Sequence, residues 1–355
     1  MFLRTAHAWA GAVLCILITV LGASGALLVF KKDYLRAVFP EARAAISLAP
    51  QDLGPVLNRI DAEYGPAGLQ YVSVGDGNFG LHKAVFRDGG GAYLDASGET
   101  IARWEKNGRF EDWLFDLHHY LLAGNTGKLV AGAAGGAAIL LCITGLIIVW
   151  PTLRMFAWRV WPKSGLRRDL LAQHRDLGVI FALPIILIAF TGFSMVYSGP
   201  VRAMLNTLTL SEPLPAPERA EAGNGKTDWT ATLEAAELAF PGAIPRLASP
   251  PRAENGPASL RLRRPGEWHQ NGRTYVFMDP ATNLPIGTAD GHGMSRGDRA
   301  FNSLYPLHSA GVGGRLYDAF TFLTGLALTV LGVLGTWTFL RKPRRKRKKR
   351  AAVTA

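Results

Sequence analysis

Four long apolar stretches constrain what this chain of 355 residues can fold into. They run approximately over residues 8–30, 128–150, 176–198 and 317–340. Each is long enough to cross a hydrocarbon layer about 30 Å thick, which takes roughly 20 helical residues. The sequence therefore predicts a membrane protein with a bundle of four transmembrane α-helices, and it excludes a soluble enzyme.

The basic residues predict the orientation of these helices. Of the 39 Lys and Arg residues, 16 lie before the first span, in the short connection 151–175 or in the tail that begins "RKPRRKRKKR", and only two acidic residues accompany them. Basic residues of short loops stay in the cytoplasm. We therefore expect both termini to be cytoplasmic, with membrane lipid as a partner and no nucleic acid. The first span is also compatible with a signal peptide, but its length favours a retained helix.

The two long connections are expected to fold as outer α+β domains. Each has one helix-like stretch, at 51–64 and 229–240, followed by strand-like stretches at 69–74 and 82–87, and at 258–263 and 273–278. Each then enters a turn that begins with Asp, in "YLDASGETI" and "FMDPATNLPI". The predicted order is helix 1–30, outer domain 31–125, helix 126–150, connection 151–175, helix 176–198, outer domain 199–315, helix 316–340 and basic tail 341–355.

Similar phrases recur at the ends of the apolar spans. Three spans end in "SGALLVF", "TGLIIVW" and "TGFSMVY", and the fourth ends in the looser match "LGTWTFL". The outer domains share an order of elements as well. Our interpretation is an internal duplication, in which a helix, an outer domain and a second helix occur twice.

Four histidines occupy equivalent positions in this repeat. His7 and His174 each precede a glycine by four residues, Gly11 and Gly178, and each lies 18 residues before the glycine of its closing phrase. That spacing is about 27 Å of helix, nearly the thickness of the membrane. Both histidines are therefore expected at the cytoplasmic ends of their helices.

The second pair of histidines is expected at the outer face. His118 and His308 each lie 27 residues before the glycine of the closing phrase, which places them at the outer ends of the returning helices. His119 does not fit this register, and it stays an alternative to His118.

Two histidines at each face suit a pair of b-type haems, each held by two axial imidazoles. A haem needs axial nitrogen ligands on both sides and an apolar slot for its flat ring. A glycine four residues after a ligand lies on the same face of the helix and leaves room for that ring. The alternatives are histidines with a structural role and ligands for Zn²⁺ or Cu²⁺.

In these motifs the chain resembles the PepSY-associated transmembrane family. The resemblance rests on the starts at His7 and His174, the entries "LHHYLLAG" and "LHSAGVGG", and the "TG" helix ends. It extends over nearly the whole chain, and the outer strand–turn–strand units look like PepSY-type domains. One branch of this family consists of di-haem ferric-siderophore reductases of the bacterial inner membrane.

The resemblance implies a transmembrane oxidoreductase. His7 and His174 would ligate an inner haem and His118 and His308 an outer haem, and a ferric siderophore or other ferric chelate would be reduced to release Fe²⁺ in the periplasm. The cytoplasmic segments are too short for a flavin or nicotinamide domain, so the electron donor is expected to be quinol or a separate cytoplasmic reductase.

Two other functions remain open at this point. One is a membrane protein without enzymatic activity that binds or regulates a partner through its outer domains. The other is a haem electron carrier for a different periplasmic acceptor.

Overall fold

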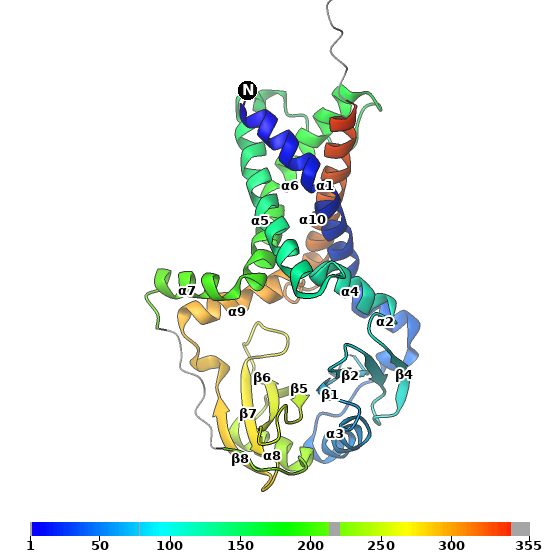
Figure 1. The fold of residues 1–355 in the computed structure, drawn as a ribbon, viewed down its shortest axis with the longest axis vertical. Helices are drawn as coiled ribbons and strands as arrows, with labels where there is room; N and C mark the ends of the chain where they lie inside the picture. The colour runs from blue at the N-terminus through cyan, green and yellow to red at the C-terminus, as the bar shows by residue number, and fades with distance from the viewer. Residues whose placement is uncertain (1, 78, 213–220, 342–355) are drawn as a thin grey trace, which may run out of the picture.

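The computed structural model describes residues 2–77, 79–212 and 221–341. A helix bundle forms one tier, and a β-sheet with its helices forms the other (Figure 1). Four helices are long and apolar enough to cross a membrane: α1 (Phe2–Leu28), α5 (Gly124–Val149), α6 (Arg167–Val196) and α10 (Gly314–Leu340). They confirm the four predicted spans.

Each long helix packs mainly against two others. Helix α1 lies against α10 and α5, and α6 lies against α5 and α10, so that α1 faces α6 diagonally and α5 faces α10. Small residues bring α1 and α10 close together: a Cβ atom at Gly22 would lie 2.8 Å from the carbonyl oxygen of Gly325. Such close approach is how helices associate in lipid, where burial of apolar surface contributes little.

Helices α1 and α6 extend beyond their apolar stretches at the end of the bundle where α1 begins, which we call the terminal end. Helix α6 begins at Arg167, so that it includes the last residues of the connection expected at 151–175. The rest of that connection contains the short helix η2 (Trp150–Met155). It is held to α6 by the buried carboxylate of Asp176, whose Oδ2 accepts hydrogen bonds from the backbone N–H groups of Ala157 at 3.2 Å and Arg159 at 3.3 Å.

Four shorter helices lie between the bundle and the sheet, at the end of the bundle that we call the sheet end (Figure 1). They are α2 (Lys31–Val38), α4 (Phe110–Tyr120), α7 (Ser198–Leu208) and α9 (Arg296–His308). Their presence corrects one expectation: His118 and His308 lie on α4 and α9, not on the returning helices. Turns with positive φ separate the helices: Leu121 (φ 48°) and Leu122 (φ 58°) lie between α4 and α5, and Gly313 (φ 76°) precedes α10.

The eight strands form one antiparallel sheet in the order β4-β3-β2-β1-β5-β6-β7-β8. The first half holds β1 (Leu69–Ser73), β2 (His82–Phe86), β3 (Gly91–Leu94) and β4 (Thr100–Trp104). The second half holds β5 (Ile244–Ser249), β6 (Ala258–Arg263), β7 (Thr274–Asp279) and β8 (Leu284–Ala289). The two halves meet where Val72 of β1 pairs with Ala248 of β5.

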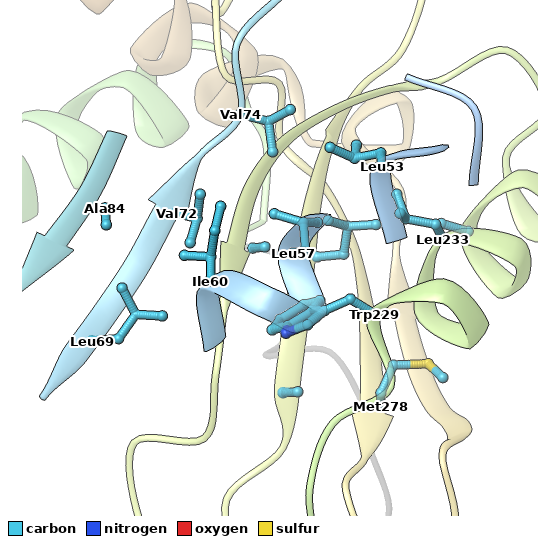
Figure 2. Close-up of a cluster of buried hydrophobic side chains, with 14 of the residues drawn as sticks. Leu53, Leu57, Ile60, Leu69, Val72, Val74, Ala84, Trp229, Leu233 and Met278 are labelled. Carbon is cyan, nitrogen blue, oxygen red and sulfur yellow. The ribbon is translucent and has the colours of Figure 1, made fainter. Parts of the chain in front are cut away.

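The two outer regions share one hydrophobic core, which differs from the two separate domains expected. Helices α3 (Pro50–Tyr64) and α8 (Trp229–Ala239) cover the face of the sheet that is turned away from the bundle (Figure 1). Figure 2 shows Leu57 and Ile60 of α3 beside Trp229 of α8, above strands of both halves. A shared core is favoured for two reasons. A region of about 100 residues has only a small hydrophobic core by itself. Joining the two half-sheets also removes one open edge from each.

The turns that begin with Asp form as the sequence predicts. Asp95 Oδ1 accepts hydrogen bonds from the backbone N–H of Ser97 at 2.9 Å and of Glu99 at 3.0 Å, between β3 and β4. Asp279 Oδ1 does the same for Ala281 at 3.0 Å, between β7 and β8. These side chains close each turn by satisfying backbone donors.

Trp229→Ala should destabilise both halves of the sheet together. The indole is 1% exposed, and its Nε1–H donates to Asp61 Oδ2 at 3.1 Å, so the substitution removes core volume and a bond to α3. We expect a loss of about 3–5 kcal/mol in the free energy of unfolding of the outer tier. Pulse proteolysis of the detergent-solubilised chain in urea measures this loss. Leu238→Ala, at a side chain of the same helix that is 86% exposed, should cost less than about 0.5 kcal/mol. Equal losses would contradict a shared core.

Candidate functional site

The structure brings the four predicted histidines together in two pairs. The terminal pair, His7 of α1 and His174 of α6, has its ring centroids 6.5 Å apart with the ring planes at 81°. The sheet-side pair, His118 of α4 and His308 of α9, has its centroids 6.0 Å apart with the planes at 37°. Residues more than 160 positions apart in the chain therefore face one another at each end of the bundle.

Each pair comes from opposite sides of the bundle. His7 and His174 lie on the diagonal helices α1 and α6. His118 and His308 lie on α4 and α9, the helices that lead into the other diagonal, α5 and α10 (Figure 1). A group placed between the two rings of a pair would therefore lie inside the bundle and be approached from both sides.

Each imidazole lies against the glycine of a closing phrase on a neighbouring helix. The glycines give the rings their space, because a Cβ atom built on any of them would lie near the Cε1 atom of a histidine. The distances from that Cβ to Cε1 are 2.8 Å for Gly25 and His118, 2.8 Å for Gly192 and His308, 3.4 Å for Gly145 and His7, and 3.8 Å for Gly335 and His174. At Gly25 and Gly192 a methyl group would collide with the ring.

A hydroxyl group beside three of these glycines holds the Nδ1 atom of the histidine. The contacts are His7 Nδ1 to Thr144 Oγ1 at 2.9 Å, His118 Nδ1 to Ser24 Oγ at 3.0 Å, and His308 Nδ1 to Thr191 Oγ1 at 3.1 Å. Each of these hydroxyls donates its own proton to a carbonyl oxygen of its helix, of Leu140, Val20 and Ile188 respectively. The hydroxyl oxygen therefore accepts a hydrogen bond from Nδ1–H.

This arrangement fixes which ring nitrogen is free. We assign the proton to Nδ1, and His308 supports the assignment because its Nδ1 also lies 3.0 Å from the carbonyl oxygen of Ile188, which can only accept. The lone pair then lies on Nε2. An Nδ1–H held by an acceptor is the arrangement that orients a histidine as a metal ligand and makes its Nε2 more basic.

His174 is the exception among the four. The residue before its glycine is Leu334, which offers no hydroxyl, and His174 Nδ1 is buried without a hydrogen-bond partner among the described residues. The terminal pair therefore joins one histidine with a hydroxyl partner to one without it.

Gly11 and Gly178, which were predicted to leave room for a cofactor, have open space beside them near the terminal pair. A Cβ atom at Gly11 would have no atom within 4 Å, and at Gly178 it would lie 3.9 Å from Leu331 Cδ2. Their proposed part in a cofactor site stays a prediction.

The alternative ligand His119 and two arginines near the histidines lie outside the pairs. The ring of His119 stacks on Phe115, with centroids 5.3 Å apart, so that it belongs to a different contact from His118. Arg175 and Arg109, which lie near histidines in the sequence, form ion pairs with the buried carboxylates of Asp176 and Glu111, both at 2.6 Å.

The hydroxyl partners are the functional residues that sequence reasoning missed. Their signal was present, since Ser24, Thr144 and Thr191 each precede the glycine that was used to define the repeat. Only the packing of the helices shows that these hydroxyls face the imidazoles of other helices.

The fold and the paired histidines define an integral membrane protein with two histidine sites in a four-helix core. Residues 4–342 match the model of the PepSY-associated TM region, and the chain belongs to this family. No curated protein matches the chain in a sequence comparison.

Gly192→Ala should push the ring of His308 away from its hydrogen-bond acceptors. Because the new methyl group would lie 2.8 Å from Cε1, the ring must move away from Thr191 and Ile188. Loss of a hydrogen bond worth about 1 kcal/mol would reduce the preference for the Nδ1–H tautomer roughly fivefold. Nitrogen-15 NMR of histidine-labelled protein measures the tautomers. Gly199→Ala, where a Cβ meets no atom within 4 Å, is the control and should leave the spectrum unchanged. An unchanged His308 signal in Gly192→Ala would contradict the described contact.

Proposed function

We propose that this chain is a di-haem b oxidoreductase of the bacterial inner membrane that reduces a ferric siderophore in the periplasm and releases Fe²⁺. In this proposal the terminal end of the bundle faces the cytoplasm, as the basic residues there favour, and the sheet lies in the periplasm. One observation carries the proposal: two pairs of facing imidazoles, one at each end of the bundle, each ring held through Nδ1 or a glycine contact so that Nε2 is left for a metal.

The spacing of the rings fits a shared metal ion. Imidazole nitrogen binds a metal at about 2 Å, so two imidazoles on opposite sides of one ion have their ring centroids about 6 Å apart. The observed separations are 6.5 Å in the terminal pair and 6.0 Å in the sheet-side pair.

The number of ligands favours haem over a bare metal ion. Structural zinc sites have four protein ligands, and catalytic ones usually have three. Among the described residues, no group of three or more His, Cys, Asp or Glu side chains gathers at either pair. A site with two protein ligands suits an iron whose equatorial ligands come from a macrocycle.

The chain's own residues hold and orient the axial ligands. Thr144, Ser24 and Thr191 accept the Nδ1–H of His7, His118 and His308, and the four glycines let the rings lie close to the neighbouring helices. Bound haem would supply one-electron transfer, and no residue need act as an acid or base. The electron donor is proposed to be quinol or a separate cytoplasmic reductase.

The equivalence of the two halves supports an internal duplication. His7 contacts the glycine of α5 as His174 contacts that of α10, and His118 contacts the glycine of α1 as His308 contacts that of α6. The sheet has the same symmetry, because its order runs outward from the central β1–β5 pair to β4 on one side and β8 on the other.

An absorbance spectrum of the detergent-purified protein tests the cofactor. We expect two low-spin b haems per chain, and we expect His174→Ala and His308→Ala each to lose one because each removes one axial ligand. His119→Ala should keep both and serves as the matched control. A folded, colourless protein that cannot be reconstituted with haem would refute the proposal and leave a binding or regulatory role.

Mixing reduced protein with a ferric siderophore tests the reaction. Formation of Fe²⁺, trapped by a ferrous indicator, should accompany reoxidation of the haems, and both should slow at least tenfold in His308→Ala. Two haems that are not reoxidised by any ferric chelate would instead indicate an electron carrier for another acceptor.

Leu334→Thr should lower the reduction potential of the inner haem alone. The new hydroxyl would give His174 the acceptor that the other three histidines have, and a more basic imidazole favours ferric iron. Redox titration followed by absorbance measures the two potentials. Leu340→Thr, on an exposed side chain of the same helix, should change neither. Equal shifts at both haems would contradict the assignment.

A further inference from the structure

Three arginines gather on the bundle-facing surface of the second half of the sheet. Arg261 and Arg263 of β6 alternate with Leu260 and Leu262, which lie in the core beneath α8, so the arginines lie on the opposite face. Arg273 immediately precedes the neighbouring strand β7. All three are half-buried.

These arginines lack carboxylate partners within the part of the chain that the structure describes. Some other cations of the outer tier have such partners: Arg264 pairs with Asp290 at 2.7 Å and Lys83 with Asp112 at 2.6 Å. Arg261, by contrast, donates to uncharged acceptors, the carbonyl of Gly272 at 2.6 Å and His269 Nδ1 at 3.3 Å.

The nearest acidic side chain is already occupied by backbone donors. Glu267 is buried, and its two carboxylate oxygens accept hydrogen bonds from the backbone N–H groups of Arg264 at 2.6 Å and Arg273 at 2.8 Å. The side chain of Arg273 has no hydrogen bond to the described residues, and its Nε atom is buried without a partner. A buried donor without a partner is costly, so this atom favours an acceptor from beyond the described residues, such as a bound ligand.

The positive charge of the cluster comes from its three arginines, and the nearby His269 is neutral. Burial, together with the positive charges of Arg273, Arg261 and Arg263, lowers the pKa of His269 to about 3. Burial and the charge of Arg273 also lower the pKa of Arg261. Repulsion among these cations is relieved when an anion binds between them.

The loop between β6 and β7, residues 264–273, holds Arg273 and contacts α9, the helix of His308 in the sheet-side pair. The ring of His269 stacks on Tyr305, with centroids 4.9 Å apart and planes at 17°, and Tyr305 lies one helical turn before His308. Gln270 Nε2 donates to the hydroxyl of Ser309, the next residue after His308, at 3.4 Å. An anion on this cluster would therefore be held beside the sheet-side pair.

We propose that Arg261, Arg263 and Arg273 form an anion-binding site for the carboxylate groups of the ferric chelate, so that the substrate is a polycarboxylate chelate with net negative charge. This inference rests on the proposed function and names its substrate class. Guanidinium groups match carboxylates with paired hydrogen bonds, and they keep their charge when half-buried. The indole of Trp268, 58% exposed in the same loop, offers an apolar surface beside the cations.

Binding of gallium citrate by isothermal titration calorimetry tests the site apart from any redox reaction, because Ga³⁺ is not reduced under these conditions. Wild-type protein should bind it, and binding should weaken as salt is raised. Arg273→Gln should weaken binding at least tenfold, since the side chain loses a charge-assisted contact and has no structural partner among the described residues. Arg252→Gln removes the same charge from the exposed turn at the opposite end of β6, and it should bind as wild type does.

Several outcomes would overturn the site. One is no binding by the wild type, and another is equal binding by Arg273→Gln and wild type. A third is loss of haem from Arg273→Gln, which would show that the arginines hold the haem propionates instead. Absence of haem with gallium citrate binding intact would refute the reductase while leaving the anion site standing. Unchanged thermal unfolding of Arg273→Gln confirms that the variant is folded.

Discussion

The contact between an imidazole and the glycine of a neighbouring helix is the constraint on which the bundle depends. A histidine ring occupies the volume that a side chain at Gly25 or Gly192 would need, so histidine and glycine positions must match along two helices at once. The adjoining hydroxyl then fixes the orientation of the ring through Nδ1. Because each of the four long helices supplies one glycine that contacts a histidine of another helix, the same contacts determine both which helices are neighbours and where the free ring nitrogens lie.

The repeat in the sequence was enough to predict the four spans and the pairing of the histidines. The four apolar stretches carry that information, together with the equal spacings from the histidines to Gly25, Gly145, Gly192 and Gly335. These spacings are informative because an α-helix rises by a fixed distance per residue. The spacing also misled at one point. The interval from His118 to Gly145 includes a turn between two helices, whose residues with positive φ the sequence did not reveal.

The joined sheet could not be predicted from the sequence, because strand β5 lacks the alternation of apolar and polar residues that indicates a strand. Its central residues, Pro245 to Ala248, include a proline and an arginine, and the strand is defined by pairing with β1 and β6. Likewise, the sequence shows Trp229 only as an apolar residue at the start of a helix. In the fold its indole N–H donates a hydrogen bond from α8 to Asp61 of α3. Such contacts between distant segments are set by tertiary packing rather than by local propensity.

The two halves agree in their backbone and differ in their charges. On the first half, Lys83 and Lys31 share the carboxylate of Asp112, which also accepts a hydrogen bond from Trp104, so both of these cations have an acidic partner within the chain. On the second half the equivalent face keeps Arg261 and Arg273 without carboxylate partners among the described residues. The two histidine pairs in the helix bundle require the two halves of the chain to have matching backbones. A single ligand on the bundle-facing surface of the sheet would instead require the halves to differ in their side chains. The charge difference therefore marks the second half as the side on which an anionic partner is received.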